Sequence, residues 1–485
     1  IYLHLDTTVL SGKRLAEYKT WHKLNMEVLQ RTANRGSIST GPYDVPFSTA
    51  FDRTRTEYYT RDVSSAGNRD VGTISMWIKR GRGDLAQYLF TFGNTDNDNG
   101  RTFARFQVDN TLWIGGGSTF WRKTTRVFRD FSAWYHIVIA FDTTQGTAND
   151  RIKLYVNGVQ ETSFSATANP SQNDNLGINF EKQVIGYNSI DNGQPYDGNI
   201  CEVVIQDGVA SAPTEFGEFS DTGQWIPIDP SGVTFGTNGA YLNFADSGTM
   251  GNDVNGGTDF TGNNLNSTDL STDTCTNNFA TWNYATGYLQ GSATAFTGGN
   301  LIRQGGSSAY NACVGTIGIN PFSNTNKWYY ELETSVTING SSNELLFGLI
   351  STTSMSAAAH ANTDIDDSVL VKYASASLAG EGALQAGGIV GILLECGTNP
   401  VLKLYKNDQL VWTKTHGSDV TFEDEFYLPY VAVANTSVEA IANFGNPIQE
   451  FAIASGNTDA EGLGNFEFTT KGGYSWCTKN LAEYG

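Results

Sequence analysis

The chain has little positive charge and no long apolar run. It carries 30 Lys and Arg against 50 Asp and Glu, which gives a net charge of −20 at pH 7. Nucleic-acid binding needs clustered basic residues that displace counterions from phosphates, so we expect no nucleic-acid partner. No apolar run approaches the length that crosses a bilayer, so we expect no membrane insertion.

Cysteine is scarce as well. The five cysteines are an odd number, lie far apart and form no C-x-x-C pair: Cys201, Cys275, Cys313, Cys396 and Cys477. This spacing predicts neither a disulfide framework nor a zinc site. No signal peptide opens the chain, and we therefore expect assembly in a reducing cytosol.

Catalytic motifs are missing. The E-x-D-x-x-E triplet of β-sandwich glucanases is absent, and Glu331 and Glu333, which share a strand face, have no third carboxylate. No H-x-x-x-H pair and no G-x-S-x-G elbow occurs. His136 lies in an alternating strand and is predicted to be a core or rim residue. We predict no catalytic residue and no enzyme activity, and a glycoside hydrolase is the least favoured alternative.

What the chain does contain is typical of β-sandwiches. It has 53 Gly, 12% aromatic residues and 39% hydrophobic residues over 485 positions, enough for several domains with tight turns. The stretch "VGTISMWIKR" (71–80) alternates apolar and other residues, as a half-buried strand does. In "RIKLYVNGVQETSF" the pair Asn157-Gly158 predicts a type I′ hairpin turn.

Several stretches resemble known families. "AFDRTRTEYYTRD", "ISMWIKRG", "AWYHIVIAFDTTQ", "DRIKLYVNGVQ" and "YDGNICEVVIQDG" resemble the concanavalin A-like jelly roll of laminin G and pentraxin modules, most closely the version in structural proteins of tailed, often marine, bacteriophages. The order W-Y-Y-E-L-E, F-G-L-I, V-G-I-L-L-E, L-Y-K-N-D-Q-L, L-P-Y-V-A-V, A-N-F-G resembles a SPRY domain. "DTCTNNFATWN" and residues 476–481 resemble the connector and closing strap of the same phage proteins.

The resemblance and the composition together predict an all-β chain with two concanavalin A-like jelly-roll sandwiches in tandem, laminin G-like and then SPRY-like, after a short N-terminal helix. We divide the chain into an N-terminal helical attachment or oligomerisation segment (1–45), a laminin G-like sandwich (46–220), an Asn/Gly/Ser/Thr-rich connector (221–290), a SPRY-like sandwich (291–455) and a C-terminal strap (456–485).

The same resemblance implies a non-enzymatic virion protein of a tailed phage. It would be a tail fibre, an appendage or a capsid decoration that is assembled in the host cytoplasm and located on the virion. Its expected partners are other virion proteins, copies of itself in a homo-oligomer such as a trimer, and host-surface glycans. The alternative is a free calcium-dependent lectin or adhesin.

Calcium is the one cofactor that we expect. In "FGNTDNDNGRTF" (92–103) an EF-hand is excluded, because the twelfth residue from Asn94 is Arg105. Calcium sites of laminin G-like domains use loop Asp residues at the rim, which implies Asp96 and Asp98, with Asp191 and Asp197 of a second acidic loop expected at the same edge. A plain turn is the competing interpretation, since Asn, Asp and Gly favour turns.

Aromatic residues near these loops are the expected glycan contacts. Phe120 and Trp121 follow the glycines of "WIGGGSTFWRK", and a Trp face can stack on a sugar ring. Tyr187 and Tyr196 flank the second acidic loop. Burial of Trp121 in the core is the competing interpretation.

Overall fold

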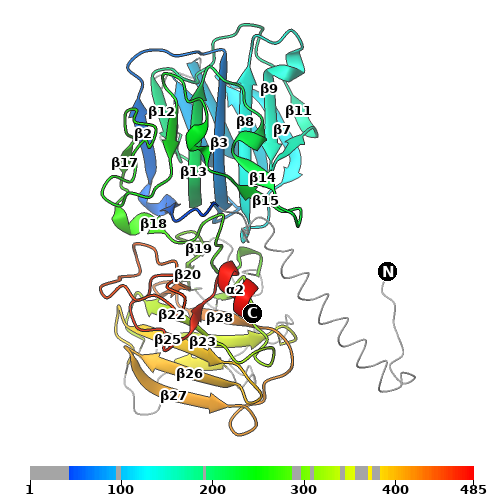
Figure 1. Cartoon of the computed structure of the whole chain (residues 1–485). Coiled ribbons are helices and arrows are strands. Elements are labelled where there is room, and N and C mark those ends of the chain that lie inside the picture. Colours follow the sequence, from blue (N-terminus) through cyan, green and yellow to red (C-terminus); the bar gives the residue numbers. More distant parts are fainter. Residues whose placement is uncertain are drawn as a thin grey trace, which may run out of the picture.

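The computed structural model describes residues 43–93, 100–188, 193–286, 296–305, 311–338, 344–354, 370–373 and 383–485. The predicted N-terminal segment 1–45 lies outside the described residues except for residues 43–45, so its helix stays a prediction. The described residues form two β-sandwiches, one above the other (Figure 1).

The first sandwich consists of two antiparallel sheets. One sheet runs in the order β10 (Val159–Glu161), β9 (Ile152–Val156), β8 (Trp134–Asp142), β3 (Val71–Arg80), β13 (Gly198–Asp207), β1 (Ser48–Phe51) and β18 (Leu270–Ser271), with β16 (Ala240–Leu242) also paired to β13. The facing sheet runs in the order β11 (Phe164–Thr167), β7 (Thr119–Val127), β6 (Thr111–Gly116), β5 (Arg101–Phe106), β4 (Gln87–Gly93), β12 (Lys182–Ile185), β2 (Tyr58–Asp62) and β17 (Thr261–Asn263). A separate hairpin joins β14 (Gly217–Phe219) to β15 (Trp225–Pro227).

The second sandwich is built in the same way. Its larger sheet runs in the order β19 (Phe296–Thr297), β20 (Ile302–Gln304), β29 (Glu439–Asn443), β22 (Lys327–Thr334), β25 (Ile389–Glu395), β26 (Val401–Lys406) and β27 (Gln409–Thr415). Its smaller sheet runs in the order β21 (Asn311–Val314), β28 (Tyr427–Ala434), β23 (Glu344–Ser351) and β24 (Leu370–Tyr373).

Two hairpin turns have the backbone that the sequence predicts or echoes. Asn157 and Gly158 have φ angles of 48° and 77°, and the β9–β10 hairpin closes there. Asn407 and Asp408, with φ angles of 46° and 68°, close the β26–β27 hairpin. Positive φ at both central residues is the requirement of a type I′ turn, so the predicted turn at Asn157-Gly158 is confirmed.

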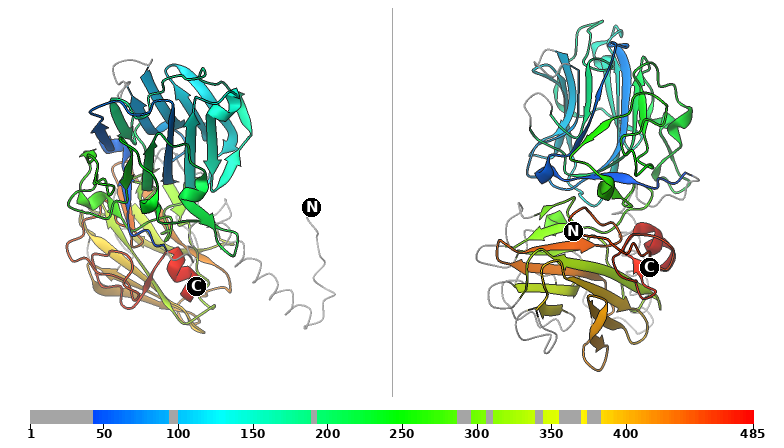
Figure 2. Two further views of the ribbon diagram at one scale, coloured as in Figure 1. Left: turned by 45° about the horizontal axis from the view of Figure 1, so that its top comes forward. Right: turned by 90° about the vertical axis from the view of Figure 1, so that its left-hand side faces the viewer.

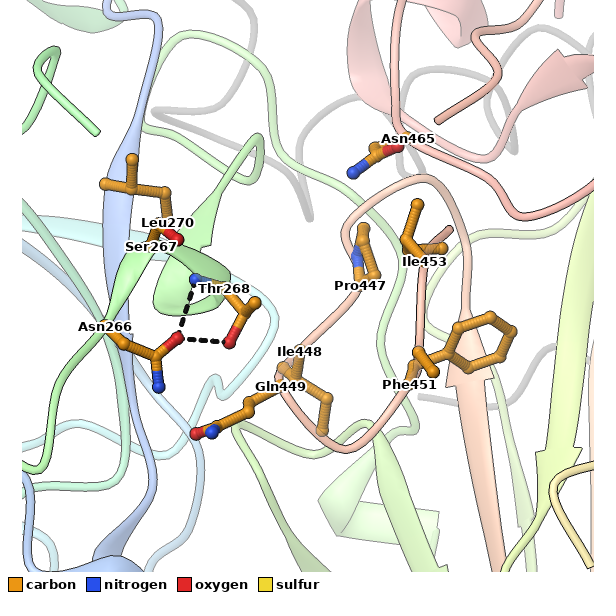
Figure 3. Close-up of a pocket in the computed structure, with 11 residues that line it drawn as sticks. Asn266, Ser267, Thr268, Leu270, Pro447, Ile448, Gln449, Phe451, Ile453 and Asn465 are labelled. Atoms are coloured by element: carbon orange, nitrogen blue, oxygen red, sulfur yellow. Dashed lines mark hydrogen bonds between the residues drawn. The ribbon is translucent and has the colours of Figure 1, made fainter. Parts of the chain in front are cut away.

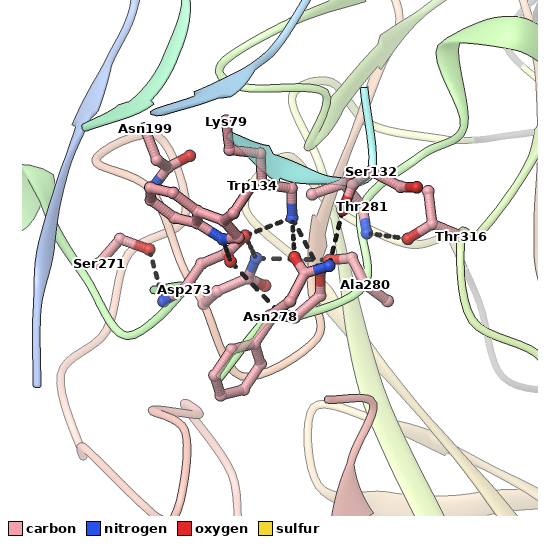
Figure 4. Close-up of polar contacts among 12 residues, drawn as sticks. Lys79, Ser132, Trp134, Asn199, Ser271, Asp273, Asn278, Ala280, Thr281 and Thr316 are labelled. Atoms are coloured by element: carbon pink, nitrogen blue, oxygen red, sulfur yellow. Dashed lines mark hydrogen bonds and ion pairs between the residues drawn. The ribbon is translucent and has the colours of Figure 1, made fainter. Parts of the chain in front are cut away.

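The outer face of β3 is buried, although its alternation predicts a half-buried strand. Apolar Ile74, Met76 and Ile78 point into the core, as expected, while Lys79 on the other face is only 2% exposed. Its ammonium group donates to Asp273 Oδ2 (2.6 Å), Asn278 Oδ1 (2.6 Å) and the backbone oxygen of residue 279 (3.0 Å). Residues 273–279 therefore cover this sheet, and Figure 4 shows the network.

The C-terminal residues close the second sandwich and return to the junction. β30 (Tyr474–Ser475) pairs in parallel with β22, and α2 (Thr478–Tyr484) follows it beside the junction (Figure 2). The buried carboxylate of Glu331 accepts hydrogen bonds from the backbone N–H groups of Glu467 (3.1 Å) and Phe468 (2.9 Å). Glu331 is thus an anchor for the C-terminal strap.

Candidate functional site

The outer face of the second sheet of the first sandwich carries a row of alternating rings and cations. Strand register places Tyr88 (β4) opposite Arg105 (β5), Arg105 opposite Trp113 (β6), and Trp113 opposite Lys123 (β7). Their neighbours along the strands, such as Ala104 and Leu112, point into the core. Because side chains alternate along a strand, the four residues of the row must face away from the core.

A second row on the same face adds two more rings. Phe103 (β5) is opposite Gly115 (β6), and Gly115 is opposite Phe120 (β7). A Cβ atom at Gly115 would lie 2.6 Å from the Phe103 ring and 2.5 Å from the backbone oxygen of Thr119. The glycine therefore leaves the space that the Phe103 ring occupies.

We call the six side chains of these two rows the platform: Tyr88, Phe103, Arg105, Trp113, Phe120 and Lys123. Trp113 and Phe120 meet edge to face, with ring centroids 4.6 Å apart and planes at 73°. The Lys123 Nζ lies 4.0 Å from the Trp113 centroid and 4.6 Å from the Phe120 centroid. The Arg105 Cζ lies 5.3 Å and 5.2 Å from the same two centroids, so both cations are within cation–π range of one ring pair.

The cations of the platform have no carboxylate partner among the described residues. Arg105 Nη1 donates to Tyr88 Oη (3.1 Å) and Gln194 Oε1 (3.4 Å). Its Nε and Nη2 donate to the Gln107 amide oxygen at 2.8 Å and 2.7 Å, in the amide orientation that satisfies both groups. Lys123 Nζ has no hydrogen bond or ion pair within that part of the chain, and its contacts are the two rings. Trp113, Phe120, Arg105 and Lys123 are half-buried, which leaves part of each accessible.

Phe120 and Trp121, which the sequence analysis predicts as glycan contacts, point to opposite faces of β7. Phe120 lies on the platform, whereas Trp121 is 6% exposed and packs in the core of the first sandwich. Adjacent strand residues point to opposite faces, so the prediction that Trp121 contacts a glycan does not fit this placement. Trp113, which the sequence interpretation missed, takes that position, and its alternation with core residues Leu112 and Ile114 was the available signal.

The two predicted tyrosines are also covered. Tyr196 is fully buried, and its hydroxyl donates to the backbone oxygen of Lys79 at 3.0 Å, so a glycan cannot reach it in this fold. Tyr187 is 7% exposed and stacks on Tyr58, with centroids 4.6 Å apart. Burial raises the pKa of Tyr187. The Tyr187 backbone oxygen accepts a hydrogen bond from Thr91 Oγ1 (3.0 Å). Thr91 is the cross-strand partner of Phe103 on the outer face of the sheet.

Of the four aspartates proposed for calcium, the structure describes one. Asp96, Asp98 and Asp191 lie outside the described residues, and calcium there stays a prediction. Asp197 is 1% exposed, and its Oδ1 accepts from the backbone N–H of Gly299 at 3.1 Å, across the junction of the sandwiches. Burial raises the pKa of Asp197 to about 7, which does not suit a rim ligand for calcium.

The described residues that flank the two acidic loops lie near opposite ends of β4. Gly93, which precedes residues 94–99, is opposite Lys182 at one end of β4. Gln194, which follows residues 189–192, accepts from the Tyr88 N–H (3.0 Å) near the other end of β4. In the described ranges, no group of three or more His, Cys, Asp and Glu side chains is placed to hold a metal ion.

A pocket of about 670 Å³ lies at the junction (Figure 3). It is lined by Asn266, Ser267, Thr268, Leu270, Pro447, Ile448, Gln449, Phe451, Ala452, Ile453 and Asn465. None of these side chains titrates, so the lining supplies no acid, base or charge for recognition. The platform, with fixed rings and cations, is the better candidate.

Comparison with known protein families identifies the fold of the first sandwich. Residues 54–214 match the sequence model of the concanavalin A-like lectin/glucanases superfamily. The first sandwich has a concanavalin A-like, laminin G-like fold. No curated protein matches the chain. No described helix is long and apolar enough to cross a membrane.

Solved structures resemble parts of the chain at low identity and low TM-score. A putative carbohydrate-binding protein from Bacteroides ovatus is 16% identical, with 46% of this chain and 59% of that protein covered and a TM-score of 0.32. The Ruminococcus gnavus IT-sialidase CBM40, bound to α2,3-sialyllactose, is 16% identical over 35% of this chain and 95% of its own, with a TM-score of 0.26. Domains LG4-5 of the mouse laminin α1 chain are 10% identical over 81% of this chain and 83% of their own, with a TM-score of 0.29.

Proposed function

We propose that the chain is a non-enzymatic glycan-binding protein and that the platform is its binding surface. The observation that carries the proposal is the half-buried pair Trp113 and Phe120 on an outer sheet face, with two cations beside it. Sugar-binding sites combine ring surface, on which the C–H groups of a pyranose pack, with a few placed polar groups that fix orientation. The match to a superfamily of lectins and glucanases supports this class of ligand.

Binding without hydrolysis fits the composition of the platform. Most glycoside hydrolases need two carboxyl groups that flank the scissile bond. The six platform side chains include none, and Glu331, one of the two carboxylates considered from the sequence, holds the strap in the other sandwich.

The test is glycan binding by the purified chain, by Trp113→Ala and by Phe120→Ala, on a broad glycan array followed by calorimetry with the best ligand. Each variant should weaken binding at least about tenfold, as loss of a ring at the centre of a site does. The matched control is Trp412→Ala, which removes a half-buried tryptophan with its own lysine, Lys414, at 5.4 Å on the second sandwich. Equal binding by wild type, Trp113→Ala and Trp412→Ala would contradict the platform as the site.

Calcium belongs to the proposal as a support for the loops. The array should be run in millimolar calcium and again in excess EDTA. Loss of binding in EDTA, and in Asp96→Asn and Asp98→Asn, would support a calcium-dependent site. Unchanged binding would remove calcium from the proposal and leave the platform untouched.

We further propose that the protein is a virion component of a tailed phage, with a SPRY-like second sandwich that contacts neighbouring subunits. Support comes from the resemblance of "AWYHIVIAFDTTQ", "DRIKLYVNGVQ" and the W-Y-Y-E-L-E to A-N-F-G order to phage and SPRY sequences. Antibodies against the chain should label purified particles in electron micrographs. If the antibodies detect the chain in the soluble lysate and do not label the particles, the protein is not part of the virion. Light scattering before and after deletion of residues 1–40 tests the oligomer, which should fall to monomers.

A further inference from the structure

We infer that the platform selects anionic glycans, whose sugars carry a carboxylate or a sulfate. The inference rests on the proposed glycan-binding function and adds the chemical class of the ligand. It starts from one arrangement in a chain with a net charge of −20: two cations lie beside one pair of rings, and no described carboxylate pairs with either of them.

The two charges flank one ring because of the strand register. Arg105 and Lys123 are both cross-strand partners of Trp113, one on each side of it. Like charges that approach each other repel, and the nearby rings and neutral oxygens reduce this repulsion without cancelling it. An anion that binds next to both cations would remove it. The arrangement therefore favours an anionic ligand.

Elsewhere in the described chain, several comparable cations have an acidic partner. On the same strand β7, Arg126 pairs with Glu161 at 2.6 Å. Lys403, on a strand of the second sandwich, pairs with Glu395 at 2.7 Å. The acceptors of Arg105 are instead the neutral Tyr88, Gln194 and Gln107.

Lys123 is the direct donor in this arrangement. Its ammonium group has no hydrogen bond within the described residues, so its three N–H groups are available to a ligand. Contact with Trp113 and Phe120 restricts the flexible stem, which lowers the entropy cost of holding the charge in place. Ala166, its partner on edge strand β11, is small and exposed and leaves the ammonium group open to solvent.

Arg105 has a different role in the proposed site. Four of its five N–H groups already have acceptors on Tyr88, Gln194 and Gln107, so it supplies a fixed positive field next to the anion. Trp113 and Phe120 would contact the sugar ring that carries the acidic group. These roles predict that Lys123 determines the preference for an anionic glycan, and that Trp113 and Phe120 are needed to bind any glycan.

The experiment compares matched pairs of polysaccharide ligands with the full chain. One pair is a polyuronate and its carboxyl-reduced form, and the other is a sulfated polysaccharide and its desulfated form, so that the two pairs distinguish carboxylate from sulfate. Wild type should bind at least one anionic member about tenfold more tightly than its neutral counterpart, because a charge-assisted hydrogen bond is stronger than a neutral one. Added NaCl should reduce this preference.

Lys123→Gln should abolish the preference, since it removes the charge without removing a folded-state hydrogen bond. Lys123→Glu should disfavour the anionic member. Lys414→Gln, beside Trp412, is the control and should change neither affinity. A circular-dichroism spectrum that matches wild type confirms that each variant is folded.

The outcomes separate this inference from the proposed function. Equal binding of both members of each pair, lost in Trp113→Ala, would overturn anion selectivity and leave glycan binding in place. A preference that persists in Lys123→Gln would also overturn the inference, because the anion would then bind elsewhere. Absence of any glycan binding by wild type would overturn both.

Discussion

The Lys123 ammonium group lies 4.0 Å from the centroid of the Trp113 ring, on the adjacent strand of the same sheet face. A lysine held against a tryptophan keeps its charge in a fixed place, whereas a solvated lysine samples many positions. This pair links the β-sheet register to recognition, because a shift of β7 by one residue would replace Lys123 with a core-facing neighbour.

The platform depends on a glycine beneath it. We predict that Gly115→Ala destabilises the protein by about 1–3 kcal/mol, as overpacking in a filled site does. The new Cβ would lie 2.6 Å from the Phe103 ring and 2.5 Å from the Thr119 oxygen, so the ring must move. Chemical denaturation gives the free energy of unfolding, and the same variant should bind glycans more weakly.

Gly146→Ala is the matched control for this change. A Cβ at Gly146 has no atom within 4 Å, so its effect should stay within about 0.5 kcal/mol. If both alanine variants have wild-type stability and glycan affinity, the packing of Phe103 against Gly115 is not required for the site.

The sequence was informative where local rules decide the structure. Asn157-Gly158 predicted its hairpin, because the positive φ angles of a type I′ turn suit few other residues. His136, predicted as a core or rim residue, is fully buried. Alternation in "TFWRK" also contained the information that only one of Phe120 and Trp121 faces outward, and the pairing of both as glycan contacts overlooked it.

Long-range contacts were beyond local rules. Lys79 follows the alternation of an exposed strand face, yet Asp273, almost two hundred positions later, covers it. Strand register across three strands, which brings Arg105 and Lys123 to Trp113, is likewise absent from any short window of sequence. Local alternation could indicate that Trp113 faces outward, but not that Arg105 and Lys123 lie on either side of it.

The junction gives a second prediction. Lys79→Met should lower the free energy of unfolding by about 3–5 kcal/mol, because it leaves the Asp273 carboxylate buried without its cation. Both side chains of this 2.6 Å ion pair are at most 3% exposed. Lys182→Met, which breaks a solvent-exposed pair with Asp62, should cost at most about 1 kcal/mol.

A double variant distinguishes the ion pair from simple loss of packing. Lys79→Met combined with Asp273→Leu removes both charges, and it should be more stable than the sum of the two single effects predicts. Strict additivity in denaturation experiments would mean that the two charges contribute independently.

The last prediction concerns pH and begins at His136. The ring is fully buried and stacks on Trp77, with centroids 4.6 Å apart. Trp225 Nε1 donates to His136 Nδ1 (2.9 Å), so the ring proton is on Nε2, which is 2.8 Å from Ser75 Oγ. A second proton would face the Trp225 N–H, and burial lowers the pKa of His136 to about 3.

His136 should therefore destabilise the fold in acid. In the unfolded chain the histidine gains a proton below a pKa of about 6.5, whereas in the folded chain it stays neutral down to about 3. The unfolded state binds more protons in this window, so this residue lowers the free energy of unfolding by about 1.4 kcal/mol for each pH unit of acidification. His136→Gln keeps a donor and an acceptor but cannot titrate. The free energy of unfolding of each protein is measured by denaturation at pH 6.5 and at pH 4.5. Between these two values, that of the variant should fall by about 2–3 kcal/mol less than that of wild type. An equal fall in both proteins would show that His136 takes up its proton in the folded protein.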